Sequence, residues 1–247
     1  MTRALVIGGA GFIGVAACKE LMRRGVETVA GGRTPRPYGT FTSYHAFDRR
    51  DAGQLAGALE HVRPDVVLDL ARPAPADIED LVRIFDGRYV VVAQEPPATA
   101  GVVIRAHAVI GPDDPSLRIA RCIRLVERGE PIPVPEATYE RNAGLAWVKD
   151  VGYACALACD PARRLDGSSF DVAFAGVSLR DLFEAIGRAL GRPVELRPLP
   201  DAEAPYPPAP PLDLQPSQAQ LGFRPSSLED ALPETLAWYL ARARSLA

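Results

Sequence analysis

Short apolar runs and segments of helical spacing alternate along the first hundred residues. Continuous apolar runs predict five strands, at residues 3–7, 26–30, 43–47, 66–70 and 89–93. Apolar residues recurring every three or four positions predict three helices, at residues 12–24, 52–61 and 76–85. Valine-rich strands that alternate with helices are typical of a parallel sheet covered on both faces. The pattern therefore predicts an α/β fold with a doubly wound parallel sheet.

The alternation breaks after the fifth strand. Only Glu95 to Gly101 (EPPATAG) separate Gln94 from the next apolar run, residues 102–110. Two parallel neighbours need a crossover of about a dozen residues or more, usually with a helix, and two prolines with a glycine cannot form one here. We expect a shortened crossover, so either the connection is a bare extended loop or the strand pairing is unusual.

The second half of the chain is predicted to be mainly helical. Helices are expected at residues 116–128, 151–159 and 178–190 and after Ser226, and a short strand at 145–148. Capping-box patterns stand at Ser178 (SLRD) and Ser226 (SSLE), and Gly191 ends the helix that Ser178 begins. Residues 198–216 contain eight prolines, which predicts a long irregular surface segment.

Composition narrows the class of protein. Hydrophobic residues make up 47% and charged residues 24%, as in ordinary globular proteins, and no apolar run approaches the roughly 20 residues that span a bilayer. The formal net charge of −3 disfavours nucleic-acid binding. The cysteines form no CxxC pair and are expected to be small buried residues: Cys18, Cys122, Cys155 and Cys159. We therefore expect a cytoplasmic protein without membrane or nucleic-acid partners.

A glycine-rich loop lies directly between the first strand and the first helix. Gly8, Gly11 and Gly14 form GxxGxxG within GGAGFIG. In such a loop the first glycine makes the turn, the second allows a pyrophosphate to approach the backbone, and the third lets the helix pack on the strand. Backbone N–H groups at the start of the helix, here those of Phe12 and Ile13, face the anion. The motif predicts a dinucleotide site; the alternative is a purely structural turn.

Basic residues follow the second strand, where NAD sites usually carry an acid. Gly32 stands at that position, and Arg33 and Arg36 lie close by. Because an arginine fork suits a 2′-phosphate, the sequence favours NADP over NAD. Arg33 could also be a solvated loop cation.

Three further strand ends are candidates to complete the cofactor site. Asp48 follows the third strand and would meet the adenine edge, unless it only caps the next helix. Leu70, Ala71 and Arg72 follow the fourth strand and would line the adenosine, and Gln94 follows the fifth.

The chain resembles the extended short-chain dehydrogenase/reductase superfamily, in particular its NAD-dependent epimerase/dehydratase-like branch. The matching pieces are GGAGFIG at 8–14, FDRRD at 47–51, VVLDLA at 66–71, IRAHAVIGPDDP at 104–115, RGEPIPVP at 128–135, AWVKDVGYA at 146–154 and LGFRPSSLEDALPETLAWY at 221–239. The resemblance implies one extended domain over residues 1–247. Its Rossmann core would comprise about residues 1–112 and 145–175, and its small substrate-binding lobe about 113–144 and 176–247.

The chain departs from this family at the catalytic helix. The family's fifth strand usually ends in Ser or Thr and is followed by a helix with Tyr-x-x-x-Lys, whose tyrosine serves as acid and base. Here the strand ends in Ala93 and Gln94, and the two lysines, Lys19 and Lys149, follow Val15 and Leu145 at that spacing. The same helix commonly forms the family's dimer interface. We therefore expect a monomer, or a dimer with another interface.

Without that tyrosine, other residues are candidates for proton transfer and substrate binding. His107 is a candidate proton donor or acceptor beside a nicotinamide ring, or a packed strand histidine, and Glu95 is a second candidate, or an exposed loop carboxylate. Tyr139 and Arg141 fall where the family often binds the substrate, although a surface loop would fit equally. The three histidines have no metal-ligand spacing, so no metal site is expected.

Three functions remain open at this point. The first is an atypical NADPH-dependent reductase or dehydrogenase acting on a small organic molecule. The second is a non-redox isomerase, cyclase or dehydratase in the same cleft. The third is a catalytically silent dinucleotide-binding regulator. Loss of the catalytic tyrosine argues against ordinary alcohol oxidation, and less against reduction of an activated C=C or C=N bond.

Overall fold

The computed structural model describes residues 1–34, 40–94, 101–165, 167–200 and 210–245. Contacts within the chain divide it into two compact units. The first unit comprises Met1–Ala106, Lys149–Val172 and Asp213–Arg224, and the second comprises His107–Val148, Ala173–Leu212 and Pro225–Ala247.

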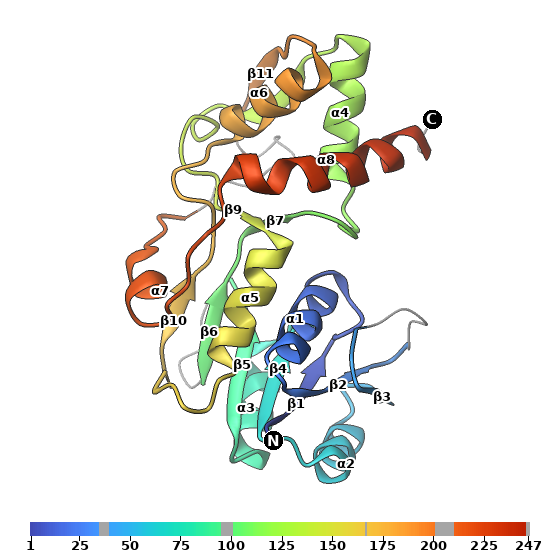
Figure 1. Ribbon diagram of the computed structural model, residues 1–247, viewed down its shortest axis with the longest axis vertical. Coiled ribbons are helices and arrows are strands. Elements are labelled where there is room, and N and C mark those ends of the chain that lie inside the picture. The colour runs from blue at the N-terminus through green and yellow to red at the C-terminus, as the bar shows by residue number, and fades with distance from the viewer. Residues whose placement is uncertain (35–39, 95–100, 166, 201–209, 246–247) are drawn as a thin grey trace. The chain divides into compact units, whose positions relative to one another are not determined.

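Within the described residues, the first unit is built on a seven-stranded parallel sheet with strand order β10-β6-β5-β4-β1-β2-β3 (Figure 1). Its strands are β1 Arg3–Ile7, β2 Glu27–Gly32, β3 Ser43–Ala46, β4 Val66–Asp69, β5 Arg88–Val92, β6 Val102–Arg105 and β10 Ser169–Asp171. Its helices are α1 Phe12–Arg23, α2 Ala52–Val62, α3 Pro75–Ile84, α5 Val148–Ala158 and the short α7 Gln215–Ala219. The predicted doubly wound Rossmann-type α/β fold is confirmed.

Side-chain alternation along the strands produces two buried faces. On one face Leu5, Val67 and Val91 pack with Leu55 of α2 and Leu81 of α3. The intervening residues of the strands, such as Ala4, Val6 and Val90, are also fully buried, and they point to the opposite face. Helices α1 and α5 pack closely together, because a Cβ on Gly152 would lie 2.7 Å from the backbone of Ala16.

The connection after β5 is the main irregularity of the sheet. β5 and β6 are parallel neighbours, with Val90 opposite Val102, so the alternative of an unusual pairing is wrong. Residues 93–101 alone join them, and residues 95–100 lie outside the described part of the chain. The apolar run 102–110, predicted as one strand, divides into β6 and a second strand, β7 Ala108–Ile110, which pairs with β9 Leu145–Trp147.

The second unit has a core of its own. Its helices are α4 Arg118–Arg128, α6 Leu179–Leu190 and α8 Leu228–Ser245, and its other strands are β8 Ile132–Pro135 and β11 Leu196–Leu199. Ile123 of α4, Phe183 of α6 and Tyr239 of α8 belong to one buried cluster. The Tyr239 hydroxyl donates a 2.6 Å hydrogen bond to the buried carboxylate of Asp114, which satisfies both groups.

One of the two predicted capping boxes is correct, and the other is displaced by one residue. Ser178 and Asp181 cap α6 reciprocally, and Gly191 ends this helix at φ 64°. At α8 the reciprocal pair is Ser227 with Asp230, not Ser226 with Glu229, because the helix starts at Leu228 and the cap lies one residue before it.

The proline-rich segment is only partly irregular. Pro198 lies in β11, and Pro216 lies in the first turn of α7, where its missing N–H costs no hydrogen bond. Residues 201–209 are outside the described ranges. The stretch Asp213–Arg224, expected in the lobe, belongs to the first unit, since the backbone N–H of Asp213 donates to the buried Asp171 carboxylate of β10.

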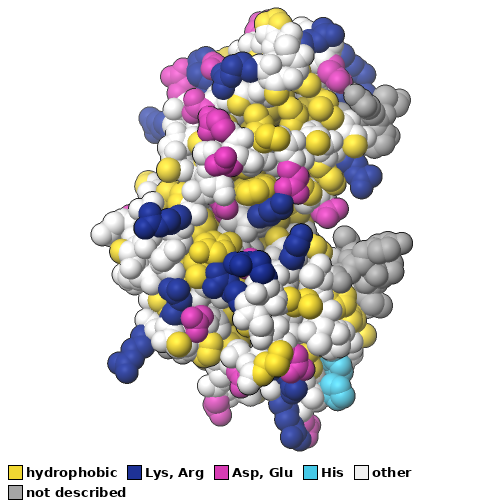
Figure 2. All heavy atoms as spheres, viewed as in Figure 1, with side chains coloured by type: hydrophobic (Ala, Val, Ile, Leu, Met, Phe, Trp, Pro, Cys, Tyr) yellow, Lys and Arg dark blue, Asp and Glu magenta, His cyan; other side chains and the backbone are white. Residues whose placement is uncertain are grey.

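The distribution of charged side chains and the burial of the cysteines agree with the expectations from composition. Basic and acidic side chains both occur on the face seen in Figure 2. The four cysteines are free and buried, as expected. No helix of the described residues is long and apolar enough to cross a membrane.

Candidate functional site

The glycine loop between β1 and α1 forms one wall of a cavity. Gly8 adopts a φ of 80°, which favours glycine, and its N–H donates to the carbonyl of Gly31 on β2. A Cβ on Gly8 would lie 3.4 Å from the backbone of Leu70. The loop therefore turns tightly between the ends of β2 and β4.

The third glycine of the motif packs the helix onto the loop. A Cβ on Gly14 would overlap the carbonyl oxygen of Gly8 and lie 2.7 Å from the backbone of Gly9. Helix α1 begins after Gly11 without a side-chain cap, so no capping side chain satisfies the N–H groups of its first turn. Such groups, with the positive end of the helix dipole, form an anion-binding surface.

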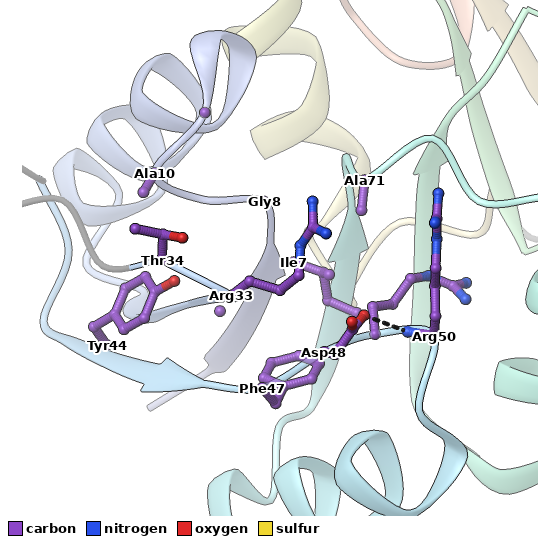
Figure 3. Close-up of a pocket in the computed structure, with 14 residues that line it drawn as sticks. Ile7, Gly8, Ala10, Arg33, Thr34, Tyr44, Phe47, Asp48, Arg50 and Ala71 are labelled. Atoms are coloured by element: carbon purple, nitrogen blue, oxygen red, sulfur yellow. Dashed lines mark hydrogen bonds between the residues drawn. The ribbon is translucent and has the colours of Figure 1, made fainter.

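The cavity lies at the carboxyl ends of β1, β2 and β3 and has a volume of about 360 Å³ (Figure 3). Five of the residues predicted for the cofactor line it: Gly8, Gly11, Arg33, Asp48 and Ala71. The other lining residues are Ile7, Ala10, Gly31, Gly32, Thr34, Tyr44, Phe47, Arg49 and Arg50. Of these, Ala10, Phe47, Arg49 and Arg50 lie in the pieces that carry the family resemblance, GGAGFIG and FDRRD, but the sequence predicts no cofactor contact for them.

The turn from β3 into α2 fixes the position of Asp48. The Asp48 carboxylate accepts the backbone N–H of Arg50 at 2.9 Å. The residue that caps α2 is Asp51, which accepts the N–H groups of Gly53 and Gln54. The alternative that Asp48 caps this helix is therefore wrong, and Asp48 lies at the cavity.

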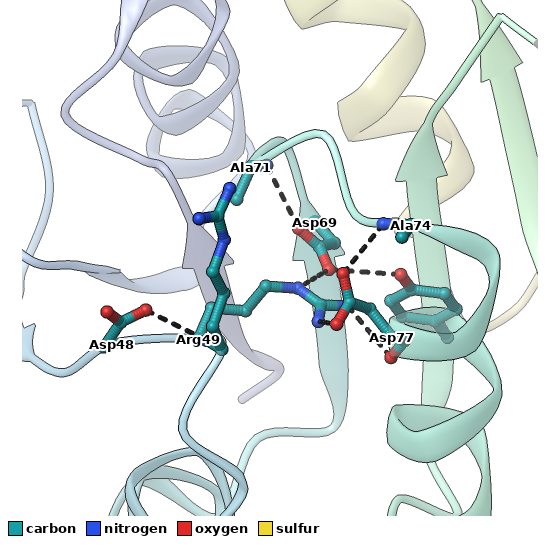
Figure 4. Close-up of polar contacts among 8 residues, drawn as sticks. Asp48, Arg49, Asp69, Ala71, Ala74 and Asp77 are labelled. Atoms are coloured by element: carbon teal, nitrogen blue, oxygen red, sulfur yellow. Dashed lines mark hydrogen bonds and ion pairs between the residues drawn. The ribbon is translucent and has the colours of Figure 1, made fainter.

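A buried ion pair forms the base of this turn (Figure 4). Arg49 Nε donates to Asp69 at 2.8 Å, with side-chain exposures of 7% and 0%. The second Asp69 oxygen accepts the N–H of Ala71 at 3.1 Å, and Arg49 also donates to the carbonyl of Asp77. The Tyr89 hydroxyl is 3.2 Å from Asp69. These bonds join the ends of β3 and β4 to α3 and β5.

Burial and charge act in opposite directions on this pair. Burial raises the pKa of Asp69, and the adjacent Arg49 charge and the hydrogen bonds from Ala71 and Tyr89 oppose that rise. Burial also disfavours the charge on Arg49, but the Asp69 carboxylate outweighs it, and the pKa of Arg49 lies above its usual value. Arg49 thus stays charged and paired.

The other two arginines at the cavity differ from Arg49. Arg33 and Arg50 are exposed, and neither has an acidic partner among the described residues. Gly32 leaves room beside them, since a Cβ there would meet only the Tyr44 hydroxyl, at 3.3 Å. The hydroxyls of Tyr44 and Thr34 add polar groups to the same wall. This wall is suited to a phosphate.

The remaining residues predicted to bind the cofactor lie near the cavity, away from it, or outside the described residues. Leu70 backs Gly8, while Phe12 and Ile13 begin α1. Arg72 is exposed with a φ of 54°, and Gln94 is exposed just beyond β5; neither lines the cavity. Arg36 lies outside the described residues.

The candidate catalytic and substrate residues are not brought together in one described site. His107 is half-buried in the bend between β6 and β7, and Glu95 lies outside the described residues. Tyr139 accepts a hydrogen bond from Arg180, whose guanidinium also covers its ring and pairs with Glu140 at 2.7 Å. Arg141 is exposed.

Comparisons with known proteins match the N-terminal part of the chain by sequence and nearly the whole chain by structure. Residues 4–86 match the model of the NAD dependent epimerase/dehydratase family. No curated protein matches the chain. The family model and the solved structures below confirm the resemblance; the family model itself covers only the part of the chain from β1 to α3.

Solved epimerase structures match over nearly the whole chain. UDP-glucuronic acid 4-epimerase from Bacillus cereus, with UDP-glucuronic acid and NAD, has a TM-score of 0.74 at 16% identity, covering 100% of both chains. UDP-glucose 4-epimerase from Thermotoga maritima, with UDP-glucose, has 0.73 at 17%, also covering 100% of both. The Thermus thermophilus enzyme with NAD has 0.73 at 20%, covering 96% of this chain and 99% of that one. At these identities the matches establish a shared fold.

Proposed function

We propose that the chain binds NADP(H) in the cavity and is an atypical enzyme of the short-chain dehydrogenase/reductase type, acting on a small organic substrate. The observation that carries the proposal is the joint placement around one cavity of the glycine loop and of two arginines that have no acidic partner within the described part of the chain. The NAD present in the Bacillus cereus and Thermus thermophilus structures supports a nicotinamide dinucleotide as the ligand.

The residues present fit a dinucleotide. Gly9 and Gly14 are packed so closely that a Cβ on either would approach backbone atoms within 3 Å, which keeps the loop backbone itself at the cavity wall. Gly11 has only the Gly8 carbonyl near its Cβ position, at 3.0 Å. The loop backbone and the first turn of α1 would hold the pyrophosphate, and Asp48 and Ala71 would contact the adenosine.

The choice of NADP over NAD depends on the end of β2. An acid at this position hydrogen-bonds the ribose 2′-hydroxyl in NAD sites, and Gly32 cannot do so. Arg33 offers a planar, permanently charged donor for a phosphate instead.

Bound NADPH would supply hydride to an electron-poor carbon of the substrate. The chain would supply orientation and a proton, and His107 and Glu95 are the proposed donors. Neither Lys19 nor Lys149 follows a tyrosine at the family spacing, so the base for ordinary alcohol oxidation is missing. This favours reduction of an activated C=C or C=N bond, where the protein need not deprotonate a hydroxyl.

Titration of the purified protein with NADPH and NADH, by nicotinamide fluorescence and calorimetry, tests the cofactor. We expect micromolar binding of NADPH, weakened about ten- to one-hundredfold by Arg33→Ala, with NADH affinity retained. Arg121→Ala, an exposed arginine of α4, is the matched control and should change neither affinity. Absence of binding by either nucleotide would overturn the proposal.

A second candidate is a protein that binds the nucleotide without net redox chemistry, as a non-redox enzyme or a silent regulator. The short connection 93–101 between β5 and β6 favours it, because the family places its catalytic helix there. Stoichiometric loss of nicotinamide absorbance during turnover of a substrate pool would exclude this candidate. Turnover without that loss would instead support the non-redox enzyme.

A further inference from the structure

We propose that Arg50, together with Arg33, recognises the 2′-phosphate of NADP(H). The inference rests on the proposed function and assigns a second specificity-determining residue to the same cavity. Arg33 follows β2 and Arg50 follows β3, so the two cations come from neighbouring parallel strands and line one cavity.

The turn after β3 separates the roles of two consecutive arginines. Arg49 points inward, where it is 7% exposed and bonded to Asp69. Arg50 is exposed, and it lines the cavity (Figure 3). Arg49 therefore anchors the turn, and this anchor fixes the direction of Arg50.

Hydrogen bonds on both sides of Arg50 hold its backbone. Its N–H donates to the Asp48 carboxylate at 2.9 Å, and the N–H of Asp48 donates to the Gln54 side chain at 2.9 Å. Asp51 then caps α2 with two hydrogen bonds from backbone N–H groups. The backbone that carries Arg50 is therefore fixed at the cavity before a ligand binds, so no loop ordering is needed to place this residue.

The charges around the cavity require a second cation. Asp48 lines the cavity and would repel a phosphate, and its charge offsets that of Arg33. Arg49 adds no net charge because Asp69 neutralises it. With Arg49 counted against Asp69, the charges of Arg33 and Asp48 cancel, and Arg50 leaves a net positive charge at the cavity. A dianionic 2′-phosphate also offers enough oxygens for two guanidinium groups.

Calorimetry with adenosine 2′,5′-bisphosphate and with 5′-AMP tests the assignment without any reaction, because these ligands differ only in the 2′-phosphate. We expect Arg50→Ala to weaken the bisphosphate about tenfold and to change 5′-AMP by less than about twofold. Arg50→Lys should restore part of the loss, since it keeps the charge but not the fork. Thermal unfolding should be unchanged in both variants, because Arg50 is exposed.

The possible results separate this inference from the proposed function. If Arg33→Ala weakens the bisphosphate and Arg50→Ala does not, the assignment of Arg50 is wrong and the proposed cofactor stands. If Arg50→Ala weakens both ligands equally, Arg50 acts on the shared AMP portion and the assignment is also wrong. If neither ligand nor NADPH binds the unaltered protein, the proposed function itself fails.

Discussion

The carboxyl ends of β1–β3 and of β5–β6 belong to the same parallel sheet but are built differently. At β1–β3, a glycine loop, a capped turn and a buried ion pair surround a cavity. At β5–β6, only residues 93–101 connect the strands. The first end carries the glycine loop and the arginines on which the proposed nucleotide site rests. The connection at the second end is shorter than the dozen or so residues that a helical crossover needs. Under the proposed function, nucleotide binding and catalysis would therefore depend on separate parts of this sheet.

The two ends also differ in how they bury a carboxylate. Asp69 is fully buried and pairs with Arg49, whose side chain is 7% exposed. Asp171 of β10 is equally buried, but its partner Arg105 of β6 is 31% exposed. The β1–β3 end should therefore lose more stability than the β5–β6 end when its carboxylate is removed.

The largest expected effect comes from Asp69→Ala. This change leaves the buried Arg49 with only the partly exposed Asp77 carboxylate, 3.5 Å away, and removes an acceptor from Tyr89 and Ala71. We therefore expect a loss of about 3 kcal/mol in the free energy of unfolding. Asp171→Ala is the matched variant, and its loss should be about half as large because Arg105 can reach water. Chemical denaturation measures both. Equal losses of unfolding free energy in the two variants would contradict the expected difference between the two buried carboxylates.

The next largest effect is expected from Gly14→Ala. The added Cβ would overlap the Gly8 carbonyl, so α1 must move away from the loop at a cost of about 3 kcal/mol in unfolding free energy, with loss of nucleotide binding. Gly57→Ala is the control, since its Cβ meets nothing within 4 Å on the exposed side of α2, and it should stabilise the protein by about 0.5 to 1 kcal/mol. A Gly14→Ala protein with unchanged stability and NADPH affinity would contradict the packing role.

At the β5–β6 end, the proposed proton donors should affect rate and not affinity. We expect His107→Ala or Glu95→Gln to lower turnover about one-hundredfold, because a positioned acid contributes at least that much, and to leave the Kd for NADPH within about twofold. Steady-state kinetics and calorimetry on the same preparations separate the two quantities. Unchanged turnover in both variants would show that neither residue supplies the proton.

The sequence could predict that the glycine loop, Arg33 and Asp48 lie around one cavity, because their signals are local in sequence. The glycine loop, Arg33 and Asp48 each follow a strand whose apolar run is evident, and parallel strands bring their carboxyl ends to one edge. Arg49 and Arg50 could not be told apart in this way. Only the long-range partner Asp69 decides that one arginine is buried and the next is exposed.

The elements that sequence reasoning missed depend on distant pairing. β10 has three residues and exists through its pairing with β6, and β8 and β11 stabilise each other. Such short strands carry little periodicity of their own. The family resemblance places the stretch 213–224 in the lobe, because nothing local in the sequence indicates that Asp213 and Ser217 bond to Asp171.

The smallest expected effect concerns Cys18, which lies beneath the glycine loop with its Sγ 3.7 Å from the Gly9 carbonyl. Burial raises the pKa of Cys18 from 9.0 to about 12. Above about pH 9 the unfolded chain ionises this thiol and the folded protein does not, so stability falls as the pH rises toward 12. The unaltered protein should therefore lose unfolding free energy between about pH 8 and pH 10. Over the same range the Cys18→Ala variant should lose about 1 kcal/mol less.

Cys155 of α5 provides the comparison, because burial raises its pKa to about 12 as well. Both alanine variants should show the same reduced pH dependence in denaturation. Their thiols should differ in another respect: NADPH should slow the reaction of Cys18 with a thiol reagent, since a bound pyrophosphate restrains the loop above it, and leave Cys155 unaffected. Equal protection of both thiols would indicate a global stabilisation and not a ligand held at the glycine loop.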